Sequence, residues 1–464
     1  MDYDVLILGG GIIGCAVAYE LSKYSLNVAL IEKDYDIADD VSLTNTAIVY
    51  DGMESKDDLM AKLEFMGNLK FDEISNKFSI PFQRKGSLMI AEGKNGEIKI
   101  EQMYQKAIER GMDYVRLLKG YEIREIEPNI SEDVKMALYS PNTGVICPYD
   151  LAIAYAEVAF DNGVIFKLEE EVIDIEKISR GVRVTTNKNK FTCRMVVNTT
   201  PVDNYSIYTQ KSSRFHQYKY LNYFLLNKEN TEFYSNNIFC MMENGDELIY
   251  TKSPLGNGVG YVKTDEPIDV KESVKRSKYI LKENEEKKVD SFYISNYYKD
   301  NIIIDDSFIR NGYINITGKS YAEITMTPYI AAMVVETITN NIPCKAKKDF
   351  NDRRRPLYRF KELSDEEMNE VIKMDSMYGK MICVCSKVTE GEIVDSIRRP
   401  LGARTVEGVK RRTGAIVGRC RGAYCINKII EILARETGKP MMDIVMDSKK
   451  SKIVLNRIKE FDSM

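Results

Sequence analysis

Four cysteines near the C-terminal end of the chain have the spacing of metal ligands. They form two tight pairs, Cys383 with Cys385 (C-x-C) and Cys420 with Cys425 (C-x₄-C). Because each pair fits on a single turn, the four thiolates can converge on one centre. Four thiolates suit either a [2Fe–2S] cluster or a structural zinc ion. The spacing alone does not choose between them, although zinc ribbons usually space their cysteines C-x₂-C.

The opposite end of the chain carries a glycine-rich turn of the dinucleotide-binding type. An apolar run over residues 4–8 leads into G-G-G-I-I-G at residues 9–14 and then into a segment that favours a helix. In this context Gly9 allows the tight turn, Gly11 lets the backbone approach a pyrophosphate, and Gly14 lets helix and strand pack closely. We expect the pyrophosphate at the helix N-terminus, beside Ile12 and Ile13.

A second apolar run over residues 27–31 ends at Glu32, which Lys33 follows. A carboxylate at this point accepts hydrogen bonds from a ribose diol and repels a 2′-phosphate, so FAD or NAD is favoured over NADP. We expect Glu32 and Lys33 to contact the nucleotide. A redox nucleotide at one end of the chain makes an electron relay at the other end the better interpretation, so the cysteines are assigned to [2Fe–2S].

Composition restricts the class of protein. The chain has 464 residues and a net charge of −4, so neither nucleic acid nor an anionic membrane is expected as the main partner. Nine cysteines without a secretory signal favour a reducing, cytoplasmic compartment. Glycines interrupt the N-terminal apolar stretch, so no integral membrane segment is expected. His216 is the only histidine, which limits the groups available for proton transfer near neutral pH.

Motifs along most of the chain resemble one flavoprotein family. They are residues 6–32, 81–88 (P-F-Q-R-K-G-S-L), 143–149 (T-G-V-I-C-P-Y), 389–394 and 418–420. The first 340 or so residues resemble the D-amino-acid-oxidase-like FAD-dependent oxidoreductases, closest to glycerol-3-phosphate dehydrogenases and L-2-hydroxyglutarate oxidases. Residues from about Asp375 resemble the [2Fe–2S] domain related to bacterioferritin-associated ferredoxin. That domain ends the large subunit of anaerobic glycerol-3-phosphate dehydrogenases and many flavoproteins of anaerobes.

The resemblance implies an α/β Rossmann-like FAD domain with an inserted antiparallel-sheet (α+β) substrate domain, followed by a small helical [2Fe–2S] domain. We expect the oxidoreductase to cover 1–345, with FAD segments at about 1–75, 140–205 and 300–345 and substrate-domain segments at about 76–139 and 206–299. A linker at 346–375, the [2Fe–2S] domain at 376–445 and a tail at 446–464 complete the chain.

Local patterns supply the elements that would position these residues. Periodicity predicts helices over 59–78, 98–110 and 150–160, and strands over 87–91, 181–185 and 223–226; the alternating runs at 181–185 and 223–226 indicate an antiparallel sheet. The charged stretch 351–356 is typical of a linker or hinge. Capping boxes begin helices at Ser364 and Thr389, and Thr405 caps another helix.

The resemblance also implies further site residues. Thr44 and Asn45 would lie against the flavin and its pyrophosphate, and Val172 would lie along the adenine end. The second FAD strand closes at Thr199, and Gly318 lies in a turn near the flavin ring. The chain departs from the family pattern at several positions. Tyr50 stands where relatives carry the histidine of V-I-H-x-G, and Ile294 falls near an arginine that relatives use against a substrate anion; residues 220–223, Glu323 and residues 199–201 differ as well.

Two functions therefore remain open. In the first, the chain is a dehydrogenase that passes electrons from a small hydroxy acid, polyol phosphate or amine through flavin to the cluster. Its candidate catalytic residues are Tyr50, His216 and Lys319, with Lys252 as a second possible anion-binding cation. In the alternative, the chain is a non-catalytic electron-conduit or scaffold subunit of a multi-subunit flavoprotein dehydrogenase.

In either case a partner subunit or an electron-transfer protein is expected. The basic residues of the C-terminal domain form either a solvated face or a docking surface for an acidic partner; they are Arg398, Arg399, Arg404, Lys410, Arg411, Arg412, Arg419 and Arg421.

Overall fold

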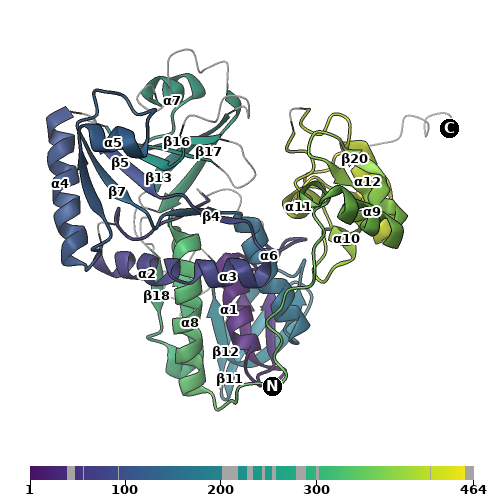
Figure 1. Cartoon of the computed structure of the whole chain (residues 1–464). Helices are drawn as coiled ribbons and strands as arrows, with labels where there is room; N and C mark the ends of the chain where they lie inside the picture. Colours follow the sequence, from purple (N-terminus) through teal and green to yellow (C-terminus); the bar gives the residue numbers. More distant parts are fainter. Residues whose placement is uncertain are drawn as a thin grey trace.

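The computed structural model describes residues 1–38, 47–55, 57–91, 93–200, 218–226, 234–242, 246–252, 258–277, 289–298, 302–418 and 420–454. Thr44, Asn45, His216 and Arg419 lie outside these residues. Figure 1 shows a sheet with long helices in the lower part, a second sheet at the upper left and the C-terminal helices at the right.

The first sheet has the strand order β10-β11-β12-β1-β2-β9, with β19 beside β12 and β18 beside β19. β1, β2, β9, β12 and β19 pair in parallel, whereas β10, β11 and β12 are antiparallel. The carboxyl ends of four parallel strands, β1, β2, β12 and β19, therefore share one edge. The strands are β1 (Tyr3–Leu8), β2 (Val28–Ile31), β9 (Ile165–Lys167), β10 (Val172–Ile178), β11 (Gly181–Thr186), β12 (Lys190–Asn198), β18 (Ile303–Asp305) and β19 (Tyr313–Thr317). The strand predicted over 181–185 is β11, and it belongs to this sheet.

Three helices pack together in the lower part of the molecule: α1 (Ile12–Ser22), α6 (Pro148–Asp161) and α8 (Glu323–Asn341). The ring of Tyr19 on α1 packs against that of Tyr155 on α6, with centroids 5.3 Å apart. The single helix predicted over 59–78 is wrong: α2 (Asp58–Asn68) and α3 (Phe71–Phe78) are separate. The chain turns between them because Phe71 enters the core, where it is fully buried.

The second sheet has the order β17-β13-β16-β15-β14-β5-β7-β6, and all its pairs are antiparallel except β14 with β5. One face joins the large core together with α4 (Gly93–Glu109), and the other face packs with α5 (Tyr121–Ile126). The strands are β5 (Ser87–Ala91), β6 (Arg116–Lys119), β7 (Met136–Ser140), β13 (Tyr218–Leu226), β14 (Asn237–Met241), β15 (Glu247–Lys252), β16 (Gly258–Thr264) and β17 (Val289–Tyr298). Helix α7 (Val270–Arg276) follows β16, and a small sheet of β3 (Ile48–Val49), β8 (Gly144–Ile146) and β4 (Phe82–Arg84) completes this part.

The C-terminal part is small and mostly helical, with a core of its own. Its elements are α9 (Asp365–Met374), β20 (Met381–Cys383), β21 (Val388–Thr389), α10 (Glu390–Arg398), α11 (Val406–Thr413) and α12 (Ile426–Thr437). Both predicted capping boxes are present, at Ser364 with Glu367 and at Thr389 with Glu392. The Thr405 side chain accepts the Gly408 N–H and caps α11, as predicted.

Ion pairs join the segment at 351–359 and the C-terminal helices to the first sheet's helical layer. Arg354 is almost completely buried and contacts Asp150 at 2.6 Å and Glu157 at 2.7 Å. Arg399, after α10, contacts the same Glu157 at 2.8 Å. Each of these buried charges has a partner of opposite charge, which offsets the cost of removing it from water. The stretch predicted as a linker or hinge is thus packed against α6.

Basic residues of the C-terminal part are also used inside the chain. Arg412 on α11 donates to both carboxylate oxygens of Asp36, at 2.6 and 2.7 Å. Asp36 follows β2, so α11 is fixed beside the glycine-rich turn, whose Gly10 carbonyl accepts the Ala38 N–H at 2.9 Å. Among the described helices, none has the length and apolar content needed to cross a bilayer.

Candidate active site and cofactor sites

Residues from distant parts of the sequence meet at the carboxyl ends of the four parallel strands. Residues 9–14 follow β1, Glu32 follows β2, Thr199 follows β12, and Gly318 follows β19. We call this set the nucleotide edge. Dinucleotides bind at such an edge in open α/β sheets because the helix N-terminus and the strand ends converge there.

The two glycines at the start of α1 have different surroundings. A Cβ added at Gly11 would have no atom within 4 Å, whereas one added at Gly14 would lie 2.0 Å from the Gly9 carbonyl oxygen. Gly9 has a φ of +101°, which disfavours any other residue. Gly11 thus faces open space, and Gly14 is a packing position. No side chain caps α1, so the N–H groups of its first turn, beginning at Ile12 and Ile13, suit an anion.

Other residues of the nucleotide edge are held in place by hydrogen bonds. The Glu32 carboxylate accepts the N–H groups of Gly10 at 2.6 Å and Asp34 at 2.9 Å. The Thr199 hydroxyl donates to the Leu8 carbonyl oxygen at 2.9 Å, which ties β12 to β1 just before the turn.

Three further predictions fall near this edge. Val172 is buried and packs in the same apolar cluster as Leu8 and Ile31, the last residues of β1 and β2. Lys33 is mostly exposed, with its ammonium 3.9 Å from the Asp34 carboxylate. Gly318 has a φ of +98° directly after β19. An open glycine, an uncapped helix and a fixed acid together fit an FAD pyrophosphate and ribose.

In the structure, the four cysteines of the C-terminal part approach one another across the two sequence pairs, Cys385 beside Cys420 and Cys383 beside Cys425. The Sγ atoms of Cys385 and Cys420 are 3.6 Å apart. Cys383 and Cys425 are buried in the domain core, and burial together with the neighbouring Cys383 raises the pKa of the Cys425 thiol to about 11. Within the described part of the chain, no three His, Cys, Asp or Glu side chains are already arranged to hold an ion.

The surroundings of Cys420 fit a thiolate ligand. The backbone N–H of Gly422 and the Cys385 thiol lower the pKa of Cys420, with smaller contributions from the N–H groups of Tyr424 and Ala423. Such donors favour the charged sulfur that binds iron. A Cβ at Gly418 would lie 2.2 Å from the Cys385 Cβ, so glycine is needed for the two cysteine loops to approach.

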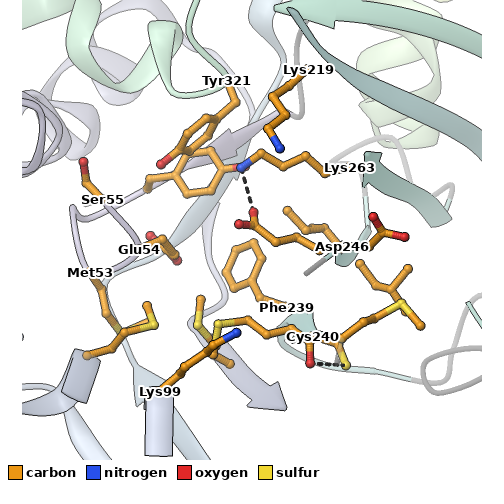
Figure 2. A pocket seen from close by; sticks show the side chains of 18 of the residues that line it. Met53, Glu54, Ser55, Lys99, Lys219, Phe239, Cys240, Asp246, Lys263 and Tyr321 are labelled. Carbon is orange, nitrogen blue, oxygen red and sulfur yellow. Dashed lines mark hydrogen bonds and ion pairs between the residues drawn. The ribbon is translucent and has the colours of Figure 1, made fainter. Parts of the chain in front are cut away.

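A cavity of about 710 Å³ lies between the second sheet and the loop that follows β3 (Figure 2). Tyr50, predicted to lie near the flavin, lines it, and so does Tyr321 from the Gly318 turn. The Tyr50 hydroxyl is 3.0 Å from that of Tyr261 on β16, and its ring meets Tyr321 edge-on at 5.0 Å. The structure therefore brings both predicted flavin-side segments to one cavity.

The cations of this cavity are not those predicted. Four lysines line it: Lys263 on β16 and Lys219 on β13, at the same end as Tyr321 (Figure 2), and Lys99 and Lys106 on α4. The Lys263 ammonium contacts Glu247 at 2.7 Å and lies 4.3 Å from the Tyr321 ring centroid. Lys319 and Lys252 are absent from the lining residues.

The cations were missed because they become neighbours only through strand pairing. Lys263 lies opposite Leu221, on the cavity face, whereas Ile294 lies opposite Asn222, the next residue of β13. Since successive side chains point to opposite faces, Ile294 lies on the face away from the cavity, and it is 45% exposed. Tyr261 and Lys263 are two residues apart on β16 and so lie on the same face of the sheet. The pairing of β16 with β13 is what shows that this face lines the cavity.

Three acidic residues in or beside the cavity were also missed: Glu54, Asp51 and Glu64. Burial, followed by the charges of Asp51 and Glu64, raises the pKa of Glu54 well above its ordinary value. Burial and Asp51 raise the pKa of Glu64, on α2, to about 8. Glu54 lines the cavity, and both its carboxylate oxygens are buried without a hydrogen-bond partner in the described structure.

Comparison with known families agrees with both halves of this description. Residues 4–337 match the family described as FAD dependent oxidoreductase. Residues 381–435, which contain all four paired cysteines, match the BFD-like [2Fe-2S] binding domain. The [2Fe–2S] assignment is thus favoured over zinc on grounds independent of spacing.

Individual relatives extend the match over the whole chain. A glycerol 3-phosphate dehydrogenase of Caloramator mitchellensis is 36% identical over 97% of this chain and 98% of its own length. A glycerol 3-phosphate oxidase of Mycoplasma pneumoniae is 29% identical over 41% of this chain and 50% of its own. A solved structure of L-alpha-glycerophosphate oxidase from the same organism, with FAD bound, covers 77% of this chain and 99% of its own, with a TM-score of 0.65 and 21% identity. This likeness identifies the fold.

Proposed function

Because the chain belongs to the FAD dependent oxidoreductase family and ends in a BFD-like [2Fe–2S] binding domain, we propose that it oxidises glycerol 3-phosphate and passes the electrons to its own cluster. The full-length similarity to a glycerol 3-phosphate dehydrogenase carries this proposal. Residues 1–345 would form the flavoprotein body, with substrate-domain segments at about 76–139 and 206–299. Residues 346–375 would connect it to a cluster domain at 376–445.

In this proposal the nucleotide edge holds FAD. The N-terminus of α1 would bind the pyrophosphate in front of Gly11, where the space is open. The Glu32 carboxylate would accept hydrogen bonds from the ribose hydroxyls, and Val172 would lie along the adenine. When bound, FAD supplies the hydride acceptor for the substrate C–H bond.

The cavity would hold the substrate. Lys263 and Lys219 can bind a phosphate group, since ammonium groups form charge-assisted hydrogen bonds with phosphate oxygens. The Tyr50 and Tyr261 hydroxyls offer hydrogen bonds to a polyol. The rings of Tyr321 and Phe239, which flank that of Tyr50, would exclude water from the reacting carbon.

A titration with three compounds tests this assignment. The anaerobic, FAD-loaded chain is mixed with glycerol 3-phosphate, L-2-hydroxyglutarate or glycerol, and flavin absorbance is followed. We expect saturable bleaching with glycerol 3-phosphate, on the order of 1–10³ s⁻¹, and little with glycerol, which lacks the anion. Faster bleaching by L-2-hydroxyglutarate would reassign the substrate, and no bleaching by any compound would favour the electron-conduit alternative.

We further propose that Cys383, Cys385, Cys420 and Cys425 hold the cluster. Replacement of Cys420 by Ser should abolish the visible iron–sulfur absorption and the iron content, while FAD stays bound. The matched change Cys344→Ser affects a half-buried free cysteine outside the pairs and should alter neither. Stoichiometric zinc in protein made with iron available would contradict the assignment.

The electrons would leave to an acidic electron-transfer protein or partner subunit. Two apolar side chains beside the paired cysteines are highly exposed, Val384 at 76% and Tyr424 at 83%. Lys387 and Arg421, also exposed, add positive charge, and residues 381–387 and 416–428 contain no acidic residue. Arg399 and Arg412 form ion pairs within the chain, so the docking surface would lie at the cysteine loops. The cysteine content, nine residues of which four would hold the cluster, supports a reducing compartment such as the cytoplasm.

A further inference from the structure

We propose that Glu54 is the catalytic base of this enzyme: its carboxylate takes the hydroxyl proton of the substrate while the hydride leaves the adjoining carbon for the flavin. This inference rests on the proposed function. The balance is complete, because a secondary alcohol loses one hydride to the bound FAD and one proton to a Glu54 oxygen, and a ketone forms. No histidine is among the described residues that line the cavity, so another group must accept this proton.

Glu54 is distinguished first by its surroundings. It follows β3 on the same loop as Tyr50 and lines the cavity (Figure 2). The residue as a whole is half-buried, but both carboxylate oxygens are shielded from solvent and lack a hydrogen-bond partner among the described residues. A buried carboxylate without partners is costly unless a ligand supplies the hydrogen bond. A substrate hydroxyl would do so.

The other acidic groups that line the cavity are already engaged. The Glu247 carboxylate pairs with Lys263 at 2.7 Å. The Asp246 carboxylate pairs with Arg276, and Asp57 accepts the Met60 N–H as the cap of α2. None of these three is left as a free proton acceptor.

The tyrosines of the cavity are less suited to the task. The Tyr50 and Tyr261 hydroxyls hydrogen-bond each other. Burial and the neighbouring carboxylates raise the pKa of Tyr321 well above 10, so it stays protonated. A neutral phenol can donate a hydrogen bond to the substrate oxygen, but it does not remove a proton.

Glu54 ionises among several other charged or titratable groups. Asp51 and Glu64 oppose its ionisation, and Lys263 favours it. Tyr114 and Tyr321 are also within electrostatic reach. Because burial and the two acids dominate, Glu54 should lose its proton at a higher pH than an exposed glutamate does. Flavin reduction should therefore rise with pH to a plateau.

The test compares wild type with Glu54→Gln, which keeps the shape and removes the base. In anaerobic single-turnover mixing with glycerol 3-phosphate, the variant should reduce its flavin about 10²–10⁴-fold more slowly. Its FAD content and its apparent Kd for glycerol 3-phosphate should stay within a few-fold of wild type. Its rate should also lose the pH dependence, whereas Glu54→Asp should recover part of both.

Asp51→Asn provides the matched control. Asp51 does not line the cavity, and its charge raises the pKa of Glu54. The asparagine oxygen can still accept the Met53 N–H, and its NH2 group can donate to the Ser140 hydroxyl oxygen in place of the bond that Ser140 now donates to Asp51. The pH profile should therefore shift to lower pH with the plateau rate retained. An unchanged pH profile in Glu54→Gln, or a rate within a few-fold of wild type, would overturn the proposal.

A second readout does not depend on turnover. Sulfate, which does not titrate in this range, should perturb the flavin spectrum by binding at Lys263. Its affinity should fall as Glu54 ionises, and Glu54→Gln should abolish that fall. If glycerol 3-phosphate fails to reduce the wild-type flavin, the proposed function fails, and this titration decides on Glu54 alone. Sulfate affinity with the same pH dependence in both proteins would refute an ionising Glu54 in the cavity.

Discussion

The nucleotide edge and the cavity beside it are built in different ways. The glycine-rich turn and Glu32 come from one short stretch of sequence, and their roles follow from local geometry. The cavity takes its charged groups from several elements remote in the sequence, among them β16, β13, β15, α4 and the loop after β3. The first region carries the glycine pattern of a dinucleotide-binding turn, whereas the charged groups of the second come together only through packing.

This difference indicates where function can change in such a fold. The pyrophosphate needs a close backbone approach, and only glycine allows it. A substrate anion needs a positive charge at the right place, and that charge can come from another strand. Here Lys263 lies on the cavity face, while Ile294 lies on the opposite face. An anion site of this kind would therefore not need an arginine at the position of Ile294.

The largest expected effect comes from two glycines in the same turn. Gly11→Val should fold but lose FAD, because its side chain would fill the open space proposed for the pyrophosphate. Gly14→Val should fail to fold, since its Cβ would lie 2.0 Å from the Gly9 carbonyl oxygen. The measurements are FAD content and circular dichroism of each purified protein. Full FAD retention in Gly11→Val would show that the turn has been misassigned.

A smaller effect is expected at the cavity lysine. Lys263→Met should raise the apparent Kd for glycerol 3-phosphate on the order of 10–100-fold, because a hydrogen bond to a charged group contributes about 1.5–3 kcal/mol. Lys252→Met removes a lysine of the same sheet that does not line the cavity, so binding should stay unchanged. The measurement is the concentration dependence of flavin bleaching. Equal effects of the two changes would remove the proposed anion site.

The smallest effect is expected at Glu64 on α2, beside the cavity. The folded-state pKa of Glu64 is about 8, above its ordinary 4.5, so the folded protein binds this proton more tightly than the unfolded chain. Its contribution to stability is therefore lost as pH rises from about 4.5 to about 8. Glu64→Gln should raise Tm by a few degrees at pH 8 and leave it unchanged near pH 4.5. The exposed Glu109→Gln on α4 is the control. A Tm difference independent of pH would contradict the buried charge.

The sequence predicted the local features well and the assembled features poorly. The strand–turn–helix at residues 9–14, the capping boxes at Ser364 and Thr389 and the paired cysteines depend on near neighbours, and they were found. Lys263, Glu54 and Glu64 become neighbours only when β16, the loop after β3 and α2 are brought together. Burial, which gives Glu64 its raised pKa, also depends on that packing. Neither these contacts nor the burial of Glu64 can be deduced from the order of residues alone.

In the proposed function, this single chain carries electrons from a substrate in the cavity to the cluster at the four cysteines. The most direct measurement mixes the anaerobic, oxidised chain with glycerol 3-phosphate, freezes samples at increasing times and records electron paramagnetic resonance. We expect the signal of a reduced [2Fe–2S] cluster to appear after the flavin bleaches, and to be missing in Cys420→Ser. A flavin that bleaches while the cluster stays oxidised, or a flavin that never bleaches, would contradict it.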